Sequence, residues 1–420
     1  MNSASELAKR IAALSPAKRG ILMQRLQEKG QGSPRDPIHR RNHQELAPLS
    51  FAQERLWFLA ALEPESVAYN LGQAYRLKGP LTVAALEKSL AEIVNRHEVL
   101  RTTFASEDGK AVQLVTPHQP AKLPVVDLTN FPEAERLGRA SKYAEEEFLR
   151  PFSLTSGRLV RSKLYRLTEI EHLLVIVVHH IAFDGWSSGI FDRELSEFYN
   201  ALCRGKEPVL SILPIQYADY AVWQRGQQEG ASLESLSYWK DALKDAPFLE
   251  LPTDAPRSAK QSHAGGRYTF RLPPHVCHQL GEFSRRENVT HFMTLLAAYQ
   301  VLLSRYSGQD DFLIGTPVAN RPNVEAEQLI GLFVNPLVLR ADLSGDPGFR
   351  EVVARVRRRT LDAFQHQHLP FERLVQEIYS ERDPSRHPLF QTTFALRNTP
   401  EDRLELSGLE VSWHTLPSCA

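Results

Sequence analysis

Ten residues from His179 to Ser188, HHIAFDGWSS, carry the side chains of this chain that are best suited to chemistry. They directly follow LLVIVV at 173–178, the most apolar run of the protein. A continuous β-branched run of this length is typical of a strand that is buried on both faces. We therefore expect two histidines, an aspartate and a glycine where a central strand passes into a loop.

Three kinds of chemistry could use such residues. A metal site needs several converging ligands, but His179 and His180 are adjacent and point to opposite sides of an extended segment. Asp184 could join one of them, yet no third ligand is nearby in the sequence, so we expect no metal. A serine or cysteine nucleophile would need a turn such as GxSxG, which this stretch lacks.

Acid–base or positioning catalysis by one histidine is the remaining chemistry. A neutral imidazole can accept a proton at physiological pH, a step worth about 10²–10⁴-fold in rate. Asp184 could brace the loop through an ion pair with an arginine from the other half of the chain, and Gly185 offers an unobstructed N–H. The alternative, that the histidine pair has only a structural role at the end of the strand, stays open.

The elements that must position this stretch alternate between strands and helices in both halves of the chain. Strands are expected at 71–77, 111–116, 159–167, 173–178, 268–272, 312–318, 392–396 and 409–415, and helices from Thr82, Glu133, Ser187 and Phe349. The alternation predicts an N-terminal α/β lobe at 46–212 and a C-terminal lobe at 213–420. Residues 1–45 are expected to form a helical linker or a docking segment.

Arg96 and Arg101 are unusual because they flank a His-Glu pair close to the end of an apolar helix. A solvated helix terminus is one interpretation of this cluster. A buried ion-pair cluster that shapes a site is the other, and the residues alone leave both open.

The bulk composition excludes several classes of protein. The chain has 420 residues and balances 50 basic against 50 acidic side chains, which argues against nucleic acid as the main partner. Three scattered cysteines fit a reducing cytoplasm and no disulfide framework. The sequence has neither an apolar run long enough for a membrane helix nor a signal-peptide pattern. We expect a cytoplasmic protein.

The HHxxxDG pattern of 179–185 resembles the motif of CoA-dependent acyltransferases and of nonribosomal peptide synthetase condensation domains. Six further stretches resemble the successive condensation-domain motifs, in order: SFAQERLWFL at 50–59, RHEVLRTTF at 96–104, YADYAVWQ at 217–224, IGLFVNPLVLR at 330–340, HQHLPFERLV at 366–375 and RDPSRHPLFQ at 382–391. The chain is thus similar to a condensation domain of the LCL or starter type. Intact histidines and Trp186-Ser187-Ser188 set it apart from cyclization, epimerization and fungal cyclizing relatives.

The resemblance implies a fold of two chloramphenicol-acetyltransferase-like α/β lobes, arranged as a V-shaped pseudo-dimer around a central tunnel. It implies that His180 acts as base or hydrogen-bond acceptor, that His179 supports the loop, and that the Gly185 N–H polarises the thioester carbonyl. Asp184 would be a structural brace paired with Arg321. Substrate contacts are expected from Trp186, Ser187, Asn335, Arg96 and Arg101.

The resemblance also implies the partners. The domain itself would bind no cofactor, and phosphopantetheine would arrive on partner carrier proteins or coenzyme A would bring the acyl group. A peptidyl carrier protein would present the acceptor amine, next to a neighbouring adenylation domain. Because the chain opens at Met1, we favour a starter domain that N-acylates the first amino acid. An LCL domain elongating a peptidyl donor in trans, a free-standing acyltransferase and a non-catalytic recruitment domain are the alternatives.

Two departures from the family pattern stand out. Pro336 replaces a common threonine, and the chain ends soon after Trp413, so the C-terminal lobe is expected to be incomplete at its end.

Overall fold

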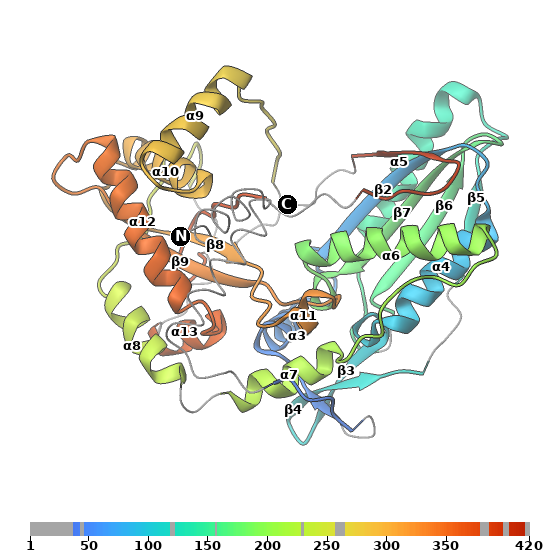
Figure 1. Ribbon diagram of the computed structural model, residues 1–420, viewed down its shortest axis with the longest axis horizontal. Coiled ribbons are helices and arrows are strands. Elements are labelled where there is room, and N and C mark those ends of the chain that lie inside the picture. The colour runs from blue at the N-terminus through green and yellow to red at the C-terminus, as the bar shows by residue number, and fades with distance from the viewer. Residues whose placement is uncertain are drawn as a thin grey trace, which may run out of the picture.

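The computed structural model describes residues 37–42, 46–117, 122–155, 158–227, 231–256, 265–378, 386–397 and 403–415. Within these ranges the chain forms two α/β lobes that lie side by side in Figure 1. Most of the predicted N-terminal segment, 1–36 and 43–45, lies outside the described residues. Residues 37–42 pack on the N-terminal lobe, where Ile38 joins its core and the Arg41 guanidinium lies 3.1 Å from Glu98.

The N-terminal lobe is built on a five-stranded sheet of order β10-β2-β7-β6-β5. Its central strand is β7 (Glu171–His179), and all of its residues from His172 onward are buried. Its antiparallel neighbours are β2 (Asn70–Lys78) and β6 (Val160–Arg166), and the outer strands are β5 (Val125–Asp127) and β10 (Glu410–Trp413). The structure confirms the expected buried strand that ends at the histidine pair.

Helices cover both faces of this sheet, which explains why its central strand is apolar throughout. Leu174, Ile176 and Val178 face the core beneath α4 (Val83–Arg96) and α6 (Gly185–Cys203), which pack against each other. The alternate residues of β7 face α5 (Glu133–Phe148). Figure 1 shows α6 lying across the sheet with its N-terminus toward the centre of the molecule.

A second, three-stranded sheet completes the base of this lobe. Its order is β1-β4-β3, with bounds Ala47–Pro48, Lys110–Val115 and Thr102–Glu107. Helices α3 (Phe51–Leu62) and α7 (Tyr217–Gly226) belong to the same core, and a 3-10 turn at Glu98–Arg101 leads from α4 into β3.

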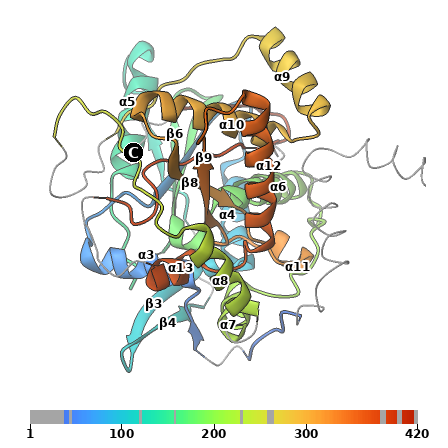
Figure 2. The same ribbon diagram turned by 90° about the vertical axis from the view of Figure 1, so that its left-hand side faces the viewer.

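The C-terminal lobe has its own core around the antiparallel pair β8 (Asp311–Val318) and β9 (Asn335–Asp342). Figure 2 shows α10 and α12 beside these strands. The helices of this lobe are α8 (Ala231–Ala242), α9 (Pro274–Arg286), α10 (His291–Ser307), α12 (Phe349–Gln365) and α13 (Phe371–Ile378).

Two predicted strands of this lobe were wrong in whole or in part. Residues 268–272 pair with no strand among the described residues, and the side chains of Tyr268 and Phe270 are exposed. The expected strand at 392–396 is reduced to a single bridge between Gly315 and Thr393. Alternating apolar residues give a segment strand propensity, but a strand forms only where a neighbour supplies the ladder.

Two segments of the second half return to the N-terminal lobe. Leu329, Ile330 and Phe333, which follow the short helix α11 (Val324–Glu327), are buried in its core. Residues 404–413 do the same, since Leu404 and Leu406 are buried there and β10 adds to the edge of β2. The chain after residue 213 therefore contributes to both lobes.

Candidate active site

The backbone of the histidine pair is fixed from both neighbouring strands at the end of β7. Asn70, the first residue of β2, lies opposite His179. The N–H of His179 donates to the carbonyl of Leu159 at 2.9 Å, and the N–H of His180 donates to the carbonyl of Tyr69 at 2.8 Å. Both histidines are therefore held by the same sheet that buries β7.

The two imidazoles adopt opposite tautomers. His180 Nδ1 lies 2.6 Å from the carbonyl oxygen of Phe183. A carbonyl can only accept, so Nδ1 carries the hydrogen and Nε2 of the neutral ring keeps its lone pair. His179 Nδ1 instead accepts from the Ile181 N–H at 3.1 Å, which puts its hydrogen on Nε2. Only His180 has an Nε2 available as an acceptor.

Burial separates the roles of the two rings further. His179 is buried against the rings of Phe152 and Tyr69. Burial, with the nearby charges of His180 and Arg161, lowers the pKa of His179 to about 3. It is thus neutral at physiological pH and its acceptor atom is already used. His180 is half-buried, so of the pair it is the one that can meet a substrate.

Asp184 caps the N-terminus of α6 and is almost fully buried. Its carboxylate accepts from the Ser187 N–H at 2.9 Å, the Ser187 hydroxyl at 2.8 Å and the Phe333 N–H at 3.0 Å. The Arg321 guanidinium donates to it at 3.0 Å. The structure thus brings together Asp184 and the arginine expected to pair with it.

Arg321 ties this carboxylate to the segment that returns from the second half of the chain. Its guanidinium also donates to the carbonyls of Ala326 and Leu329, both at 2.6 Å, and stacks on the Phe333 ring at 4.2 Å. Burial lowers the pKa of the guanidinium, but the Asp184 carboxylate opposes that shift. The result is a buried charge pair that joins the turn after β7 to the 321–333 segment.

Trp186 and Ser187 lie in the junction between the turn after β7 and the 321–333 segment. The Trp186 indole N–H donates to the Glu327 carbonyl at 3.1 Å, and the Ser187 hydroxyl oxygen accepts from the Gly331 N–H at 3.1 Å. These contacts hold the junction together and give no support to the expected substrate-binding role. Gly185, by contrast, is exposed, and a Cβ there would meet no other described atom within 4 Å.

Gln53 is a part of the junction that sequence reasoning missed. It is fully buried, accepts from the Ser50 N–H at 3.1 Å and donates to the Ile181 carbonyl at 3.3 Å. Ser50 continues the network to the Tyr217 hydroxyl at 2.8 Å. The Ser-x-x-Gln spacing of a capping box is the signal that could have pointed to this pair.

Arg96 and Arg101 belong to the buried ion-pair cluster that was one of the two interpretations. Arg96 lies 3.0 Å from the Glu194 carboxylate, and Arg101 donates to the Thr116 carbonyl at 2.5 Å. His97 is the centre of the cluster, because its ring bonds Glu194 at 2.8 Å and accepts from the Ile330 N–H at 3.3 Å. The two arginines thus have protein partners, and their contacts give no support to a role in substrate binding.

Asn335 likewise makes structural contacts. Its amide nitrogen donates to the carbonyls of Gln367 and Leu369, both at 2.9 Å, and its oxygen accepts from the Phe371 N–H at 3.0 Å. These bonds fix the loop before α13 to the start of β9. These contacts give no support to the expected role of Asn335 in substrate binding, which stays a prediction.

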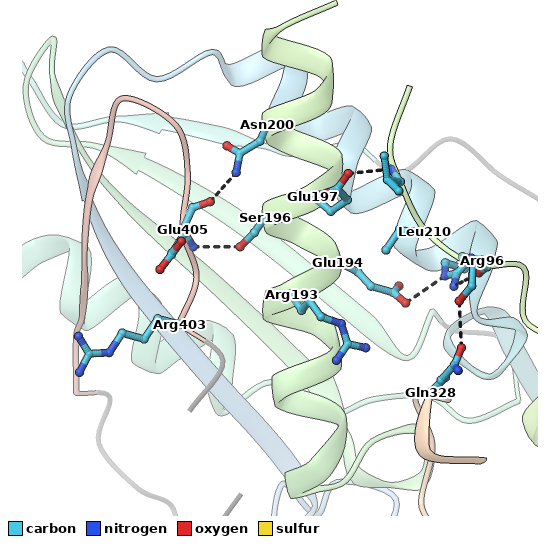
Figure 3. Close-up of a pocket in the computed structure, with 12 residues that line it drawn as sticks. Arg96, Arg193, Glu194, Ser196, Glu197, Asn200, Leu210, Gln328, Arg403 and Glu405 are labelled. Carbon is cyan, nitrogen blue, oxygen red and sulfur yellow. Dashed lines mark hydrogen bonds and ion pairs between the residues drawn. The ribbon is translucent and has the colours of Figure 1, made fainter. Parts of the chain in front are cut away.

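A pocket of about 850 Å³ lies on the outer face of α6 and not at the histidine pair (Figure 3). Its lining includes Arg193, Glu197, Arg403 and Glu405 but no residue of the 179–188 stretch. Arg193 lies eight residues along the helix from Gly185, about 12 Å at the rise of an α-helix. We therefore place the candidate active site at His180 and not in this pocket.

Gly331 provides a local test of the junction. A Cβ on Gly331 would lie 2.1 Å from a ring carbon of Tyr217, which is buried. Gly331→Ala should therefore lower the free energy of unfolding by about 1–3 kcal/mol in urea titrations. Gly138→Ala is the matched control, because Gly138 lies inside α5 with open space around it and should gain up to about 1 kcal/mol. Equal effects at both glycines would contradict the close packing of this junction.

Among the described residues, no group of three or more histidines, cysteines, aspartates or glutamates is placed to hold a metal ion. In the same part of the chain, no helix is both long and apolar enough to cross a membrane.

Two α/β lobes joined at an HHxxxDG turn form the arrangement of a chloramphenicol-acetyltransferase-like acyltransferase. More narrowly, the chain belongs to the condensation domain family, whose sequence profile matches residues 43–417. In nonribosomal peptide synthetases, such domains catalyse amide bond formation. The chain is 50% identical over 378 residues to one subunit of the linear gramicidin synthase of Brevibacillus parabrevis, a match that covers 90% of this chain and 7% of that protein.

Solved structures confirm the predicted fold class. The X-domain from teicoplanin biosynthesis, determined in complex with OxyB, matches with a TM-score of 0.82 and 32% identity, over 92% of this chain and 84% of that one. The first condensation domain of the CDA synthetase matches with a TM-score of 0.71 over 88% of this chain and 87% of that one. Its 21% identity is a likeness of fold alone.

Proposed function

We propose that this domain joins a thioester-bound acyl donor to the amine of an aminoacyl thioester on a peptidyl carrier protein. The amine nitrogen attacks the thioester carbonyl carbon, so that a C–N bond forms and the C–S bond breaks. The sulfur of the donor arm leaves as a thiolate and takes up the proton that the amine loses, so that a free thiol results. The domain's own residues need only position two arms and handle one proton, and holding both reactants together supplies much of the rate.

The Nε2 of His180, which has no hydrogen-bond partner among the described residues, is the observation that carries the proposal. Phe183 holds the ring with its Nδ1–H engaged, so the lone pair of Nε2 is presented as an acceptor for the amine N–H. The exposed first residue of α6, Gly185, leaves open space in which the thioester carbonyl can approach its N–H. Asp184 and Arg321 keep both groups in place and do not contact the reacting atoms.

The identity of the acyl donor is the more detailed part of the proposal. One candidate donor is a fatty or short acyl starter, delivered as acyl-CoA or on an acyl-carrier protein. The similarity to linear gramicidin synthase, which is divided into several polypeptides, supports instead a peptidyl donor that another polypeptide delivers in trans. In both cases phosphopantetheine arms carry the thioesters in a cytoplasmic assembly line, beside an adenylation domain that charges the acceptor carrier.

A second candidate function is non-catalytic recruitment of a partner protein. The matching X-domain structure is a complex with OxyB, which supports a domain that binds a protein partner. In this alternative the domain recruits its partner and does not catalyse transfer. The half-buried His180 with an available Nε2 supports catalysis over this alternative.

The experiment incubates the protein with an aminoacyl-loaded carrier protein and, in separate arms, acyl-CoA, acyl-carrier protein or peptidyl-carrier protein. Intact mass spectrometry of the acceptor carrier then reports transfer. We expect a mass gain in the peptidyl arm or in an acyl arm, and the productive arm identifies the donor class. A folded protein that transfers nothing in all arms, yet binds the carrier, would establish the recruitment function instead.

A further inference from the structure

The turn at 147–151, where α5 ends, is held by side chains from both strands that flank the histidine pair. Asn70 of β2 donates to the carbonyls of Phe148 and Arg150 at 2.6 and 3.0 Å. Arg161 of β6 donates to three carbonyls, those of Glu147 at 3.1 Å, Arg150 at 2.6 Å and Pro151 at 3.0 Å. A helix leaves such carbonyls without partners at its C-terminus, so these donors lock the turn in place.

Phe152 follows this turn and connects it to the histidine pair. The Arg161 guanidinium carbon lies 3.6 Å from the centroid of the Phe152 ring, a cation–π contact. Phe152 in turn meets the His179 ring edge-on, with centroids 5.8 Å apart and planes at 73°. Tyr69 contacts the same imidazole at 6.4 Å. The orientation of His179 is therefore fixed by a stack whose outermost member is Arg161.

His179 passes this orientation on to the turn that carries His180. Its Nδ1 accepts from the Ile181 N–H, and Ile181 is the central residue of the 3-10 turn His180–Ala182. A rotation of the His179 ring would release that N–H and the turn with it. The imidazole of His180 depends on the same turn, because its Nδ1 bonds the Phe183 carbonyl at the end of it.

We propose that Arg161 and Phe152 are positioning residues for the His179–His180 pair. This inference rests on the proposed amide-forming function, because it assigns the pair a geometry that catalysis uses. Neither side chain contacts the reacting atoms. Both act through the ring of His179.

The charges around His179 give the proposal a second readout. The titratable and charged groups that face its ring are His180, Arg161 and Tyr69. Burial contributes most to its low pKa, and the Arg161 charge adds to that effect. Loss of Arg161 removes a positive charge near His179 and leaves its ring less buried, so the pKa of His179 should rise. Protonation then occupies Nδ1 and removes the acceptor for Ile181 N–H.

The test compares Arg161→Met with Arg136→Met in the full chain. Arg136 is a matched control because it also donates to three backbone carbonyls, those of Thr129, Phe131 and Leu167 at 2.8–2.9 Å, near the other end of α5. Both variants lose three similar hydrogen bonds, but Arg161 also stacks on Phe152 and lies 3.1 Å from the Glu147 carboxylate, which keeps Lys163 as a partner when Arg161 is lost. Phe152→Leu keeps Arg161 and breaks the stack, and it serves as the second variant if Arg161→Met does not fold.

We expect Arg161→Met and Phe152→Leu to lower kcat about tenfold or more with little change in KM, because small misplacements of a catalytic group are costly. In ¹⁵N-histidine NMR spectra, the tautomer signals of His179 and His180 should shift, and His179 should titrate at higher pH. Arg136→Met should keep the wild-type kcat and histidine spectrum.

Two results would overturn the proposal: wild-type histidine spectra and kcat in Arg161→Met, or equal losses in Arg161→Met and Arg136→Met. If the wild-type protein transfers no acyl group, the proposed function fails on its own. The histidine spectra then still decide whether Arg161 and Phe152 orient the pair.

Discussion

His180→Ala should lower the rate of amide formation by about 10²–10⁴-fold, the range for loss of a positioned acid–base group. The reason is that Nε2 of His180 is the acceptor for the amine, while Nδ1 is committed to the Phe183 carbonyl. The rate is measured by intact mass of the acceptor carrier under saturating donor. Circular dichroism and the unfolding midpoint should stay close to wild type, since the His180 side chain is half-buried at a loop.

His179→Ala is the informative comparison. His179 is buried and its ring holds the Ile181 N–H, so its removal should lower stability as well as activity. If His180→Ala retained the wild-type rate while His179→Ala lost it, the assignment of the two histidines would be reversed.

Asp184→Ala should lower the free energy of unfolding by about 3–5 kcal/mol, because it leaves the Arg321 guanidinium buried without its counter-charge. The helix cap on Ser187 N–H is lost at the same time. Urea titration followed by tryptophan fluorescence measures the effect, which should accompany a loss of amide formation.

Two controls make this second prediction sharp. Asp184→Ala combined with Arg321→Met should be less destabilised than Asp184→Ala alone, since no uncompensated charge remains. Glu135→Ala breaks an exposed ion pair with Arg139 and should change stability by about 0.5 kcal/mol or less. If Asp184→Ala abolished activity with unfolding untouched, Asp184 would act on the reaction itself and not as a brace.

Much of this architecture was readable from the order of residues. The apolar run before His179 predicted a strand that is covered on both faces, because its side chains would otherwise be exposed to water. β7 is such a strand. The spacing from His180 to Asp184 suggested a braced loop, and the family pattern pointed to Arg321 as the partner. These predictions succeeded because each depends on local periodicity or on one recognisable motif.

What the sequence could not predict depends on contacts between distant segments. Which imidazole keeps a free Nε2 is decided by backbone groups of Phe183 and Ile181, and a sequence does not show where these point. A substrate role was expected for Trp186, Ser187 and Asn335 because they lie in or beside motifs of the family. Their contacts within the protein, such as the Glu327 carbonyl for Trp186, appear only once the second half of the chain folds back.

The most direct measurement of the central claim is imidazole rescue of His180→Gly, with His179→Gly beside it. If Nε2 of His180 accepts from the amine, a free imidazole that enters the vacated space should restore amide formation in His180→Gly as its concentration rises. His179→Gly should not respond, because its deficit lies in the support of the turn. A wild-type rate in His180→Gly without imidazole, or equal rescue of both variants, would contradict the account.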